Sequence, residues 1–230
     1  GKEIEKVCLE RGHTISQKIT SSSTITSLDF SKTDVAIEFS TPASAENNIL
    51  FCINNRIPVI IGTTGEWCNS LESIQTLCID NNTAMLPATN FSLGVNLFFE
   101  LNTQLAKLMN NYHDYNCSVK EIHHTEKLDS PSGTGITISE QIINEHSNYN
   151  SWENVNKCEV SHVNILPLES ERLPNVPGTH EVGYENEIDK IEIKHTAHSR
   201  KGFALGSVIA AEWILNKKGV FSMKDVLNLK

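Results

Sequence analysis

The side chains with the greatest chemical capacity lie in one stretch, "KEIHHTEKLDSPSGTG", at residues 120–135. His123, His124 and Lys127 fall within five residues there, and a Ser-Gly-Thr tripeptide follows at 132–134. The tripeptide stands at the expected start of a helix, where unpaired backbone N–H groups and small side chains let an anion approach. Lysine and histidine add charge-assisted hydrogen bonds, and histidine also supplies or accepts a proton near neutral pH. The stretch therefore predicts a site that binds a carboxylate and moves a proton.

Each of these features also has a simpler structural explanation. Ser132 with Thr134 fits an ordinary helix N-cap, and a His-His pair at a strand end is commonly a surface feature. Metal binding by His123 and His124 is disfavoured because adjacent strand residues point to opposite faces of a sheet, and we predict no metal site. The combination of these features in one short stretch is what favours a functional site.

The first part of the chain alternates short buried strands with helices, which is typical of βαβ units and a parallel sheet. Strands are expected in "DVAIEFS", "PVIIGTTG" and "AMLPATNFS", with helices over about residues 43–55 and 70–81. Parallel sheets bind ligands at the carboxyl ends of their strands. Three segments therefore become candidates for ligand binding: 39–40, 62–64 and 88–91.

The pattern changes near residue 92, from βαβ to α+β. A long amphipathic helix is expected over about 92–110, a strand in "CSVKEIHH", and a helix from about residue 132. The alternating runs "KCEVSHVNILPL", "THEVGYE" and "DKIEIKHTAHS" suit an open sheet with one exposed face. An apolar helix at 202–215 and a short closing helix complete the chain. The predicted fold class is α/β: a Rossmann-like doubly wound parallel sheet plus a second α+β domain with an open mixed sheet.

Composition narrows the class of protein. The chain has 230 residues and a formal net charge of −9, which argues against nucleic acid or an anionic membrane as the main partner. No apolar run approaches the roughly 20 residues of a membrane span, and the charged opening "GKEIEKVCLERGH" does not resemble a signal peptide. The six cysteines form no C-x-x-C pair, so we expect reduced structural thiols and a cytoplasmic protein.

The beginning of the chain is unusual for this fold, because a helix is expected immediately, ending at Arg11-Gly12. Gly1 resembles the last glycine of a G-x-G-x-x-G turn, so we expect the first strand and the glycine loop to be missing from this sequence. An extended run at 13–19 precedes the polar loop 20–27. Where an NAD-binding fold usually carries an acidic residue for the ribose, this sequence has Thr20, three serines and, just before them, Lys18, which mildly favours NADPH over NADH.

The sequence resembles the 4-hydroxy-tetrahydrodipicolinate reductase family, also called dihydrodipicolinate reductase, of lysine and diaminopimelate biosynthesis. The resemblance covers essentially the whole chain and includes "IGTTG" (61–65), "ATNFSLGVN" (88–96) and "HSRKGFALG" (198–206). Its most specific part is the signature formed by Glu121, His123, His124, Lys127, Asp129, Pro131, Ser132, Gly133 and Thr134.

The resemblance implies a role for each matching residue. His123 would be the general acid/base and Lys127 the proton donor. The substrate carboxylates would be bound by His124, Ser132, Gly133 and Thr134. The nicotinamide nucleotide, NADPH or NADH, would be lined by Gly62, Thr63, Thr64, Ala88, Thr89, Asn90 and Phe91.

The resemblance also implies the reaction and the assembly. Hydride transfer to C4 of a cyclic imine dicarboxylate, with loss of its hydroxyl as water, would give tetrahydrodipicolinate. Residues 1–91 with 203–230 would form the dinucleotide-binding domain, and 92–202 the substrate-binding and tetramerisation domain of a homotetramer. Two alternatives remain: a non-catalytic nucleotide-sensing module, or another amino-acid dehydrogenase on the same fold.

Overall fold

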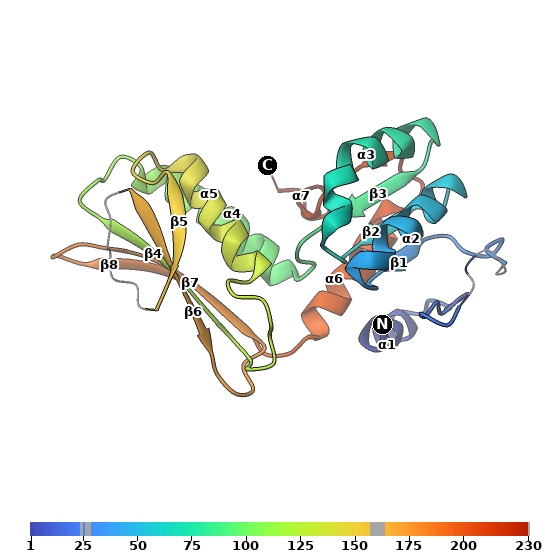
Figure 1. The fold of residues 1–230 in the computed structure, drawn as a ribbon, viewed down its shortest axis with the longest axis horizontal. Helices are drawn as coiled ribbons and strands as arrows, with labels where there is room; N and C mark the ends of the chain where they lie inside the picture. Colours follow the sequence, from blue (N-terminus) through green and yellow to red (C-terminus); the bar gives the residue numbers. More distant parts are fainter. Residues whose placement is uncertain (24, 26–28, 157–163, 230) are drawn as a thin grey trace. The chain divides into compact units, whose positions relative to one another are not determined.

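The computed structural model describes residues 1–230 except 24, 26–28, 157–163 and 230. The chain forms two compact units (Figure 1). Unit 1 comprises Gly1–Leu93 with Lys201–Lys230, and unit 2 comprises Gly94–Arg200. The last helices thus belong to the same compact unit as residues 1–93. The ligand and assembly roles assigned to 1–91 with 203–230 and to 92–202 stay predictions.

Unit 1 contains a parallel four-stranded sheet with the order β1-β2-β3-β9. The strands are β1 (Ala36–Glu38), β2 (Val59–Ile61), β3 (Ala84–Pro87) and β9 (Gly219–Val220). The helices are α1 (Lys2–Glu10), α2 (Pro42–Asn54), α3 (Leu71–Asp80), α6 (Lys201–Ile214) and α7 (Met223–Leu227), with a 3-10 helix, η2, at Glu66–Ser70.

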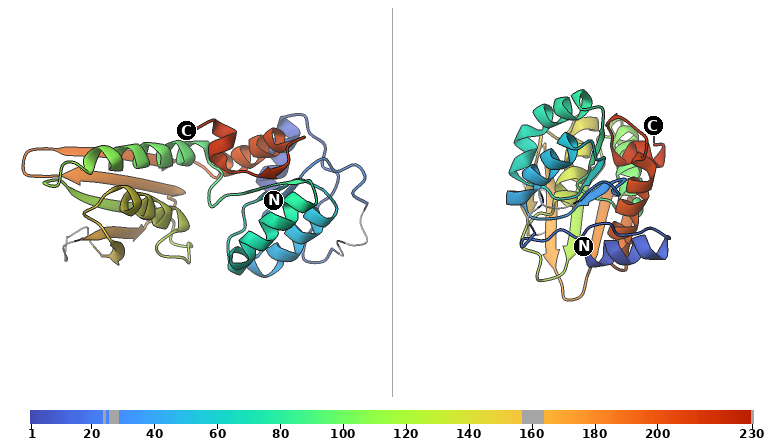
Figure 2. Two further views of the ribbon diagram at one scale, coloured as in Figure 1. Left: turned by 90° about the horizontal axis from the view of Figure 1, so that it is seen from above. Right: turned by 90° about the vertical axis from the view of Figure 1, so that its right-hand side faces the viewer.

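Alternation along β2 explains why helices cover both faces of this sheet. Val59 and Ile61 pack with residues of α2 and α3, whereas Ile60 between them packs with residues of α6 and α7. Figure 2 (left) shows these two pairs of helices on opposite sides of the strands. The doubly wound Rossmann-like prediction is confirmed, because helices cover both faces of the parallel sheet.

Unit 2 contains a mixed five-stranded sheet with the order β5-β6-β4-β7-β8. Strands β5, β6 and β4 are parallel, and β7 and β8 are antiparallel to their neighbours. The elements are α4 (Leu93–Met109, beginning at the last residue of unit 1), β4 (Asn116–His123), α5 (Gly133–Glu145), β5 (Ser151–Val155), β6 (Ile165–Arg172), β7 (Gly178–Glu185) and β8 (Lys190–Ala197).

One face of the second sheet forms the core with α4 and α5. Cys117 and Val119 of β4 are buried there with Leu166 and Leu168 of β6. Asn102 of α4 donates to the Ile138 carbonyl of α5 at 3.1 Å, which links the two covering helices. The predicted mixed sheet in an α+β unit is therefore confirmed.

Several predicted boundaries differ from the structure. The extended run at 13–19 joins no strand ladder among the described residues, because its polar side chains offer no buried face. The short strands β5 and β9 were not predicted, since "SWENV" and "GV" lack a clear period-two pattern. Of the run predicted at 157–168, residues 165–168 belong to β6, and 157–163 lie outside the described residues.

Among the described residues, no disulfide is formed by Cys8, Cys52, Cys68, Cys78 or Cys117. Burial raises the pKa of the Cys52 thiol to about 12 and that of Cys78 to about 11, so both stay protonated and unreactive at neutral pH. Within the described part of the chain, no helix is both long and apolar enough to span a bilayer.

Candidate active site

The core-facing side of the unit 2 sheet becomes polar at the carboxyl end of β4. Alternation places Glu121 and His123 on the same face as the apolar Val119. Register then sets Ser170 and Arg172 of β6 beside Glu121 and His123. On the other side, His180 of β7 lies opposite Glu121. One sheet face thus supplies both the core and a compact group of ionisable side chains.

His123 is 7% exposed, and Nδ1 has no hydrogen-bond partner among the described residues. Burial lowers the pKa of His123 to about 4; Glu121 opposes this shift, and the charges of Lys127 and Arg172 reinforce it. A Cβ on Gly178 would lie 3.3 Å from His123 Nε2, so glycine there leaves room for the ring. In this state the imidazole is neutral at pH 7 and can accept a proton.

Lys127 lies in the loop between β4 and α5. Its Nζ donates to both carboxylate oxygens of Asp129 at 2.8 Å. Burial raises the pKa of Asp129, but the hydrogen bonds and charge of Lys127 more than offset that effect and hold it below its usual value. The lysine side chain is 22% exposed, so its ammonium is held in place and still meets solvent.

His124 directly follows His123, the last residue of β4. Its Nε2 lies 2.9 Å from Nη2 of Arg200. A guanidinium only donates hydrogen bonds, so Nε2 of His124 is the acceptor in this contact. Arg200 thus adds a cation beside the predicted substrate-binding histidine.

The 132–134 tripeptide begins α5, as predicted. Ser132 is the N-cap: its hydroxyl accepts from the Gly135 N–H at 3.0 Å and donates to Glu121. Ser132 is 1% exposed, so its side chain has a structural role at the start of the helix. Gly133 is exposed, and a Cβ there would meet no described atom within 4 Å apart from its chain neighbours and the backbone of its own helix. The N-terminus of α5 is therefore open at this residue. Thr134 is 9% exposed in the same turn.

Glu121, His123 and His180 have the donor set of a metal site, and one atom from each lies within 4.8 Å of the others. Both oxygens of Glu121 already accept hydrogen bonds, however, and the guanidinium of Arg172 lies 3.4 Å from Oε1. Bound zinc would need ligand distances of roughly 2.0–2.2 Å. A cation already neutralises this carboxylate, so the cluster is better described as a hydrogen-bonded charge network.

In unit 1, Gly62 and Thr63 directly follow β2. A Cβ on Gly62 would lie 2.2 Å from Cζ of Phe39, so only glycine lets that ring cover the strand end. Thr63 is fastened by its neighbours: Oγ1 accepts from the Ser40 N–H at 2.8 Å, and its carbonyl accepts from Trp67 Nε1 at 2.7 Å. These contacts leave Thr64 exposed at the carboxyl edge.

The segment after β3 occupies the neighbouring strand end. Ala88 N–H donates to the Ile61 carbonyl, and Thr89 is exposed. Asn90 is buried, and its Oδ1 accepts from the Ser92 N–H at 2.9 Å. Phe91 is 2% exposed. Hydrogen bonds of the backbone and of the Asn90 side chain therefore hold this segment in place, and Thr89 is its exposed residue.

The carboxyl ends of β2 and β3 are neighbours, and parallel sheets bind nucleotides at this edge. Thr64 and Thr89 expose hydroxyls there, which suits a nicotinamide nucleotide, whereas the ring of Phe39 already covers Gly62. The residues brought together in unit 1 are Gly62, Thr63, Thr64, Ala88, Thr89, Asn90 and Phe91, and those brought together in unit 2 are His123, His124, Lys127, Ser132, Gly133 and Thr134.

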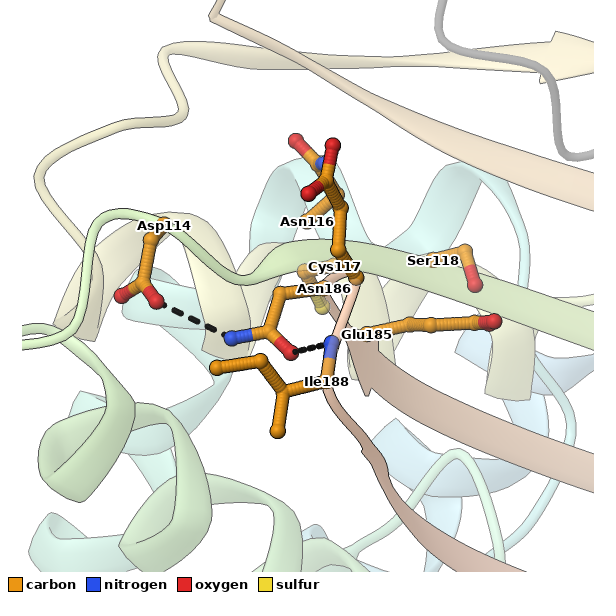
Figure 3. A pocket seen from close by; sticks show the side chains of 8 residues that line it. Asp114, Asn116, Cys117, Ser118, Glu185, Asn186 and Ile188 are labelled. Atoms are coloured by element: carbon orange, nitrogen blue, oxygen red, sulfur yellow. Dashed lines mark hydrogen bonds between the residues drawn. The ribbon is translucent and has the colours of Figure 1, made fainter.

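A surface cavity of about 630 Å³ lies elsewhere in unit 2, where β4 begins and β7 ends (Figure 3). Its lining includes Asp114, Glu185 and Glu187 and contains no lysine, arginine or histidine. Asn186 Nδ2 donates to Asp114 at 3.0 Å across it. An acidic lining repels carboxylates, so this cavity does not suit an anionic substrate.

Sequence reasoning assigned no role to Ser170, Arg172, His180 or Arg200. The predicted strand ended at 168, so the alternation that places Ser170 and Arg172 beside the histidine was not extended far enough. His180 lies within the predicted "THEVGYE" strand, but its pairing with Glu121 depends on strand register, which the sequence does not display.

Comparisons with known proteins agree with this arrangement. The family model "Dihydrodipicolinate reductase, N-terminus" matches residues 2–91, and "Dihydrodipicolinate reductase, C-terminus" matches 94–227. The 4-hydroxy-tetrahydrodipicolinate reductase of Christiangramia forsetii is 46% identical over 228 residues, covering 99% of this chain and 93% of that protein. The enzyme of Thermosipho africanus is 35% identical over 195 residues, covering 84% and 78%.

A solved structure shares the fold. Dihydrodipicolinate reductase from Paenisporosarcina sp. TG-14, with dipicolinate bound, has a TM-score of 0.65 and 23% identity, covering 86% of this chain and 74% of that one. The family also implies a nicotinamide cofactor. The chain belongs to the dihydrodipicolinate reductase family and is an oxidoreductase that reduces 4-hydroxy-tetrahydrodipicolinate in the biosynthesis of diaminopimelate and lysine.

Proposed function

We propose that the polar end of the unit 2 sheet is the substrate site of this reductase, with Lys127 as proton donor and His123 as acid/base. The observation that carries the proposal is the juxtaposition of a buried neutral histidine, a fixed ammonium and the open N-terminus of α5 on one compact unit. A chain with net charge −9 needs such a local cationic group to hold an anion.

The substrate is a dicarboxylate, and the related enzyme from Paenisporosarcina carries dipicolinate, a planar dicarboxylate. One carboxylate would be received at the α5 N-terminus by Gly133 and Thr134. His124, supported by Arg200, would contact it from the side. Ser132 contributes by shaping the helix end rather than by its hydroxyl, which Glu121 and Gly135 occupy.

A nicotinamide cofactor, when bound, would supply a hydride that replaces the 4-hydroxyl at C4 of the substrate. The hydroxyl leaves as water, and its departure consumes one proton. Lys127 holds such a proton on Nζ and is oriented by Asp129. His123, neutral at pH 7, accepts a proton and passes it on.

The cofactor is proposed to be NADPH in preference to NADH. Thr20, Ser22 and Ser23 form a turn of hydroxyl groups that bond to one another, and no carboxylate stands among them to repel a 2′-phosphate. Lys18 just before the turn is paired with Glu5, so it offers only a partly neutralised charge. The preference is therefore expected to be modest.

The assembly is proposed to be a homotetramer in the cytoplasm. The unit 2 sheet has one face outside the core, crossed by ion pairs such as Lys120 with Glu169 at 2.9 Å. Free cysteines suit a reducing compartment.

A coupled assay tests the function. Pyruvate and aspartate semialdehyde, condensed by the preceding synthase, would generate the unstable substrate, and loss of NADPH or NADH would be followed at 340 nm. Loss that requires the synthase product is expected, and its rates rank the two cofactors. Loss with an open-chain amino or keto acid instead would indicate a different dehydrogenase, and cofactor binding without turnover would indicate a sensing module.

A further inference from the structure

Glu121 is a fully buried carboxylate that the reaction as described above does not use. Oε1 accepts from the Ser132 N–H at 2.8 Å and from Ser170 Oγ at 3.0 Å, and Oε2 accepts from the Ser132 hydroxyl. Arg172 Nη2 lies 3.4 Å from Oε1. Every one of these partners is a donor, which is the environment that an ionised carboxylate requires when buried.

These bonds join three separate pieces of the site. Glu121 is on β4, two residues before His123. Its hydrogen bonds with the Ser132 N–H and hydroxyl hold the first turn of α5. Through Arg172, whose Nη2 also donates to the Asp129 carbonyl at 2.6 Å, it reaches the loop that carries Lys127. A single side chain thus links the histidine, the helix N-terminus and the lysine loop.

The close approach of the Glu121 carboxylate to α5 depends on a glycine in the first turn of that helix. A Cβ on Gly135 would lie 2.6 Å from Glu121 Oε2. Only glycine in the first turn of α5 lets the carboxylate reach the helix end, where the unpaired N–H groups and the helix dipole favour negative charge.

Glu121 also acts on His123, whose Nδ1 lies 3.8 Å from Oε2. The other ionisable groups around that ring are Lys127 and Asp129 of the loop, Arg172 of β6 and His180 of β7, whose ring lies 5.1 Å away. Lys127 and Arg172 oppose protonation of His123, and Glu121 is the larger of the two contributions that favour it.

We propose that Glu121 is a positioning residue of this reductase: it anchors the α5 N-terminus that receives a substrate carboxylate and stabilises the imidazolium formed when His123 takes up a proton. This inference rests on the proposed roles of His123 and α5. It assigns Glu121 no contact with the substrate.

The test is Glu121→Gln, which keeps the shape and removes the charge. Dipicolinate affinity, measured by calorimetry without cofactor, is expected to fall about ten-fold or more, because hydrogen bonds to a charged group are lost at the helix end. The His123 ring, followed by NMR in free and dipicolinate-saturated protein and assigned with His123→Gln, is expected to titrate about one pH unit lower, because the carboxylate that favours its protonation is gone. The limb of the kcat/KM pH profile that reports His123 moves the same way.

A matched control separates this role from a general loss of an ion pair. Glu169→Gln removes a carboxylate that pairs with Lys120 in the same sheet, and it should leave both the dipicolinate affinity and the His123 titration unchanged. Ser132→Ala removes one bond to Glu121 but keeps the charge, so it should weaken dipicolinate binding without moving the His123 titration.

Wild-type dipicolinate affinity together with an unmoved His123 titration in Glu121→Gln would overturn the proposal. If that variant does not fold, Gly135→Ala and Ser132→Ala decide, and normal dipicolinate affinity in both overturns it. If the wild-type chain neither turns over substrate nor binds dipicolinate, the proposed function fails, while the His123 titration still decides whether Glu121 acts on that ring.

Discussion

Lys127 carries the clearest expectation at the scale of single residues. Lys127→Ala should lower kcat by about 10²–10³-fold, equivalent to about 3–4 kcal/mol, because it removes a fixed positive charge and a proton from the reacting centre. Cofactor affinity should stay nearly unchanged, because the predicted cofactor-lining residues belong to the other unit. Steady-state kinetics and cofactor titration check both parts.

Lys107→Ala is the matched control for that variant. Lys107 is in the same unit and also faces a carboxylate, Glu145, at 3.6 Å, but on the helix surface. It should leave kcat unchanged. Near-normal turnover of Lys127→Ala would remove the lysine from the mechanism.

His123 and His180 make stability depend on pH. Burial lowers the pKa of His180 to about 3, reinforced by His123, and lowers that of His123 to about 4. An unfolded histidine has a pKa near 6.5, so the unfolded state binds more protons in acid. The contribution is fully present above pH 6.5 and is lost as pH falls, by about 2 kcal/mol per histidine at pH 5.

Urea unfolding between pH 5 and 8 measures this effect. The free energy of unfolding should fall steadily below pH 6.5, and the fall should be smaller in a His123→Gln/His180→Gln double variant. His198→Gln, at an exposed position, should keep the wild-type slope. A double variant with an unaltered pH slope would contradict the assignment.

At the scale of elements, α6 contains a close backbone approach that a matched pair of variants can probe. A Cβ on Gly206 would lie 1.7 Å from the Phe91 carbonyl oxygen, whereas one on Gly202 would lie 3.6 Å from Ser92 Oγ. Gly206→Ala must therefore displace the backbone after β3 and should lower the free energy of unfolding by about 1–3 kcal/mol. Gly202→Ala, in the same helix, should be neutral or stabilising by up to about 1 kcal/mol.

Urea denaturation compares the two alanine variants directly. Because residues 88–91 are predicted to line the cofactor, Gly206→Ala should also weaken NADPH binding. Equal free energies of unfolding for the two variants would contradict this prediction. They would show that the backbone after β3 can move away from α6 without loss of stability.

At the scale of the whole molecule, the expected property is self-association. Four chains of 25.6 kDa would have a mass of about 102 kDa. Light scattering after size-exclusion chromatography at micromolar concentration should give that mass. A species of one chain's mass across the concentration range would contradict the homotetramer.

The sequence by itself determined the α/β class and the residues of the reductase signature. These properties are local: hydrophobic period, turn residues and short motifs are readable from neighbours along the chain. Short strands such as β5 and β9 escaped because two to five residues carry too little periodicity to distinguish a strand from a loop.

Only the tertiary structure decided what surrounds His123. Glu121 and Ser132 are 11 residues apart in the chain, and Arg172 and His180 come about 50 and 60 residues after Glu121. Strand register brings them to one face of the sheet, and register depends on pairing between distant segments. The same register fixes how deeply His123 is buried, and burial lowers the pKa of its ring to about 4. The sequence singled out His123 as the expected acid/base, and the packing of β4 between β6 and β7 set the burial that lowers its pKa.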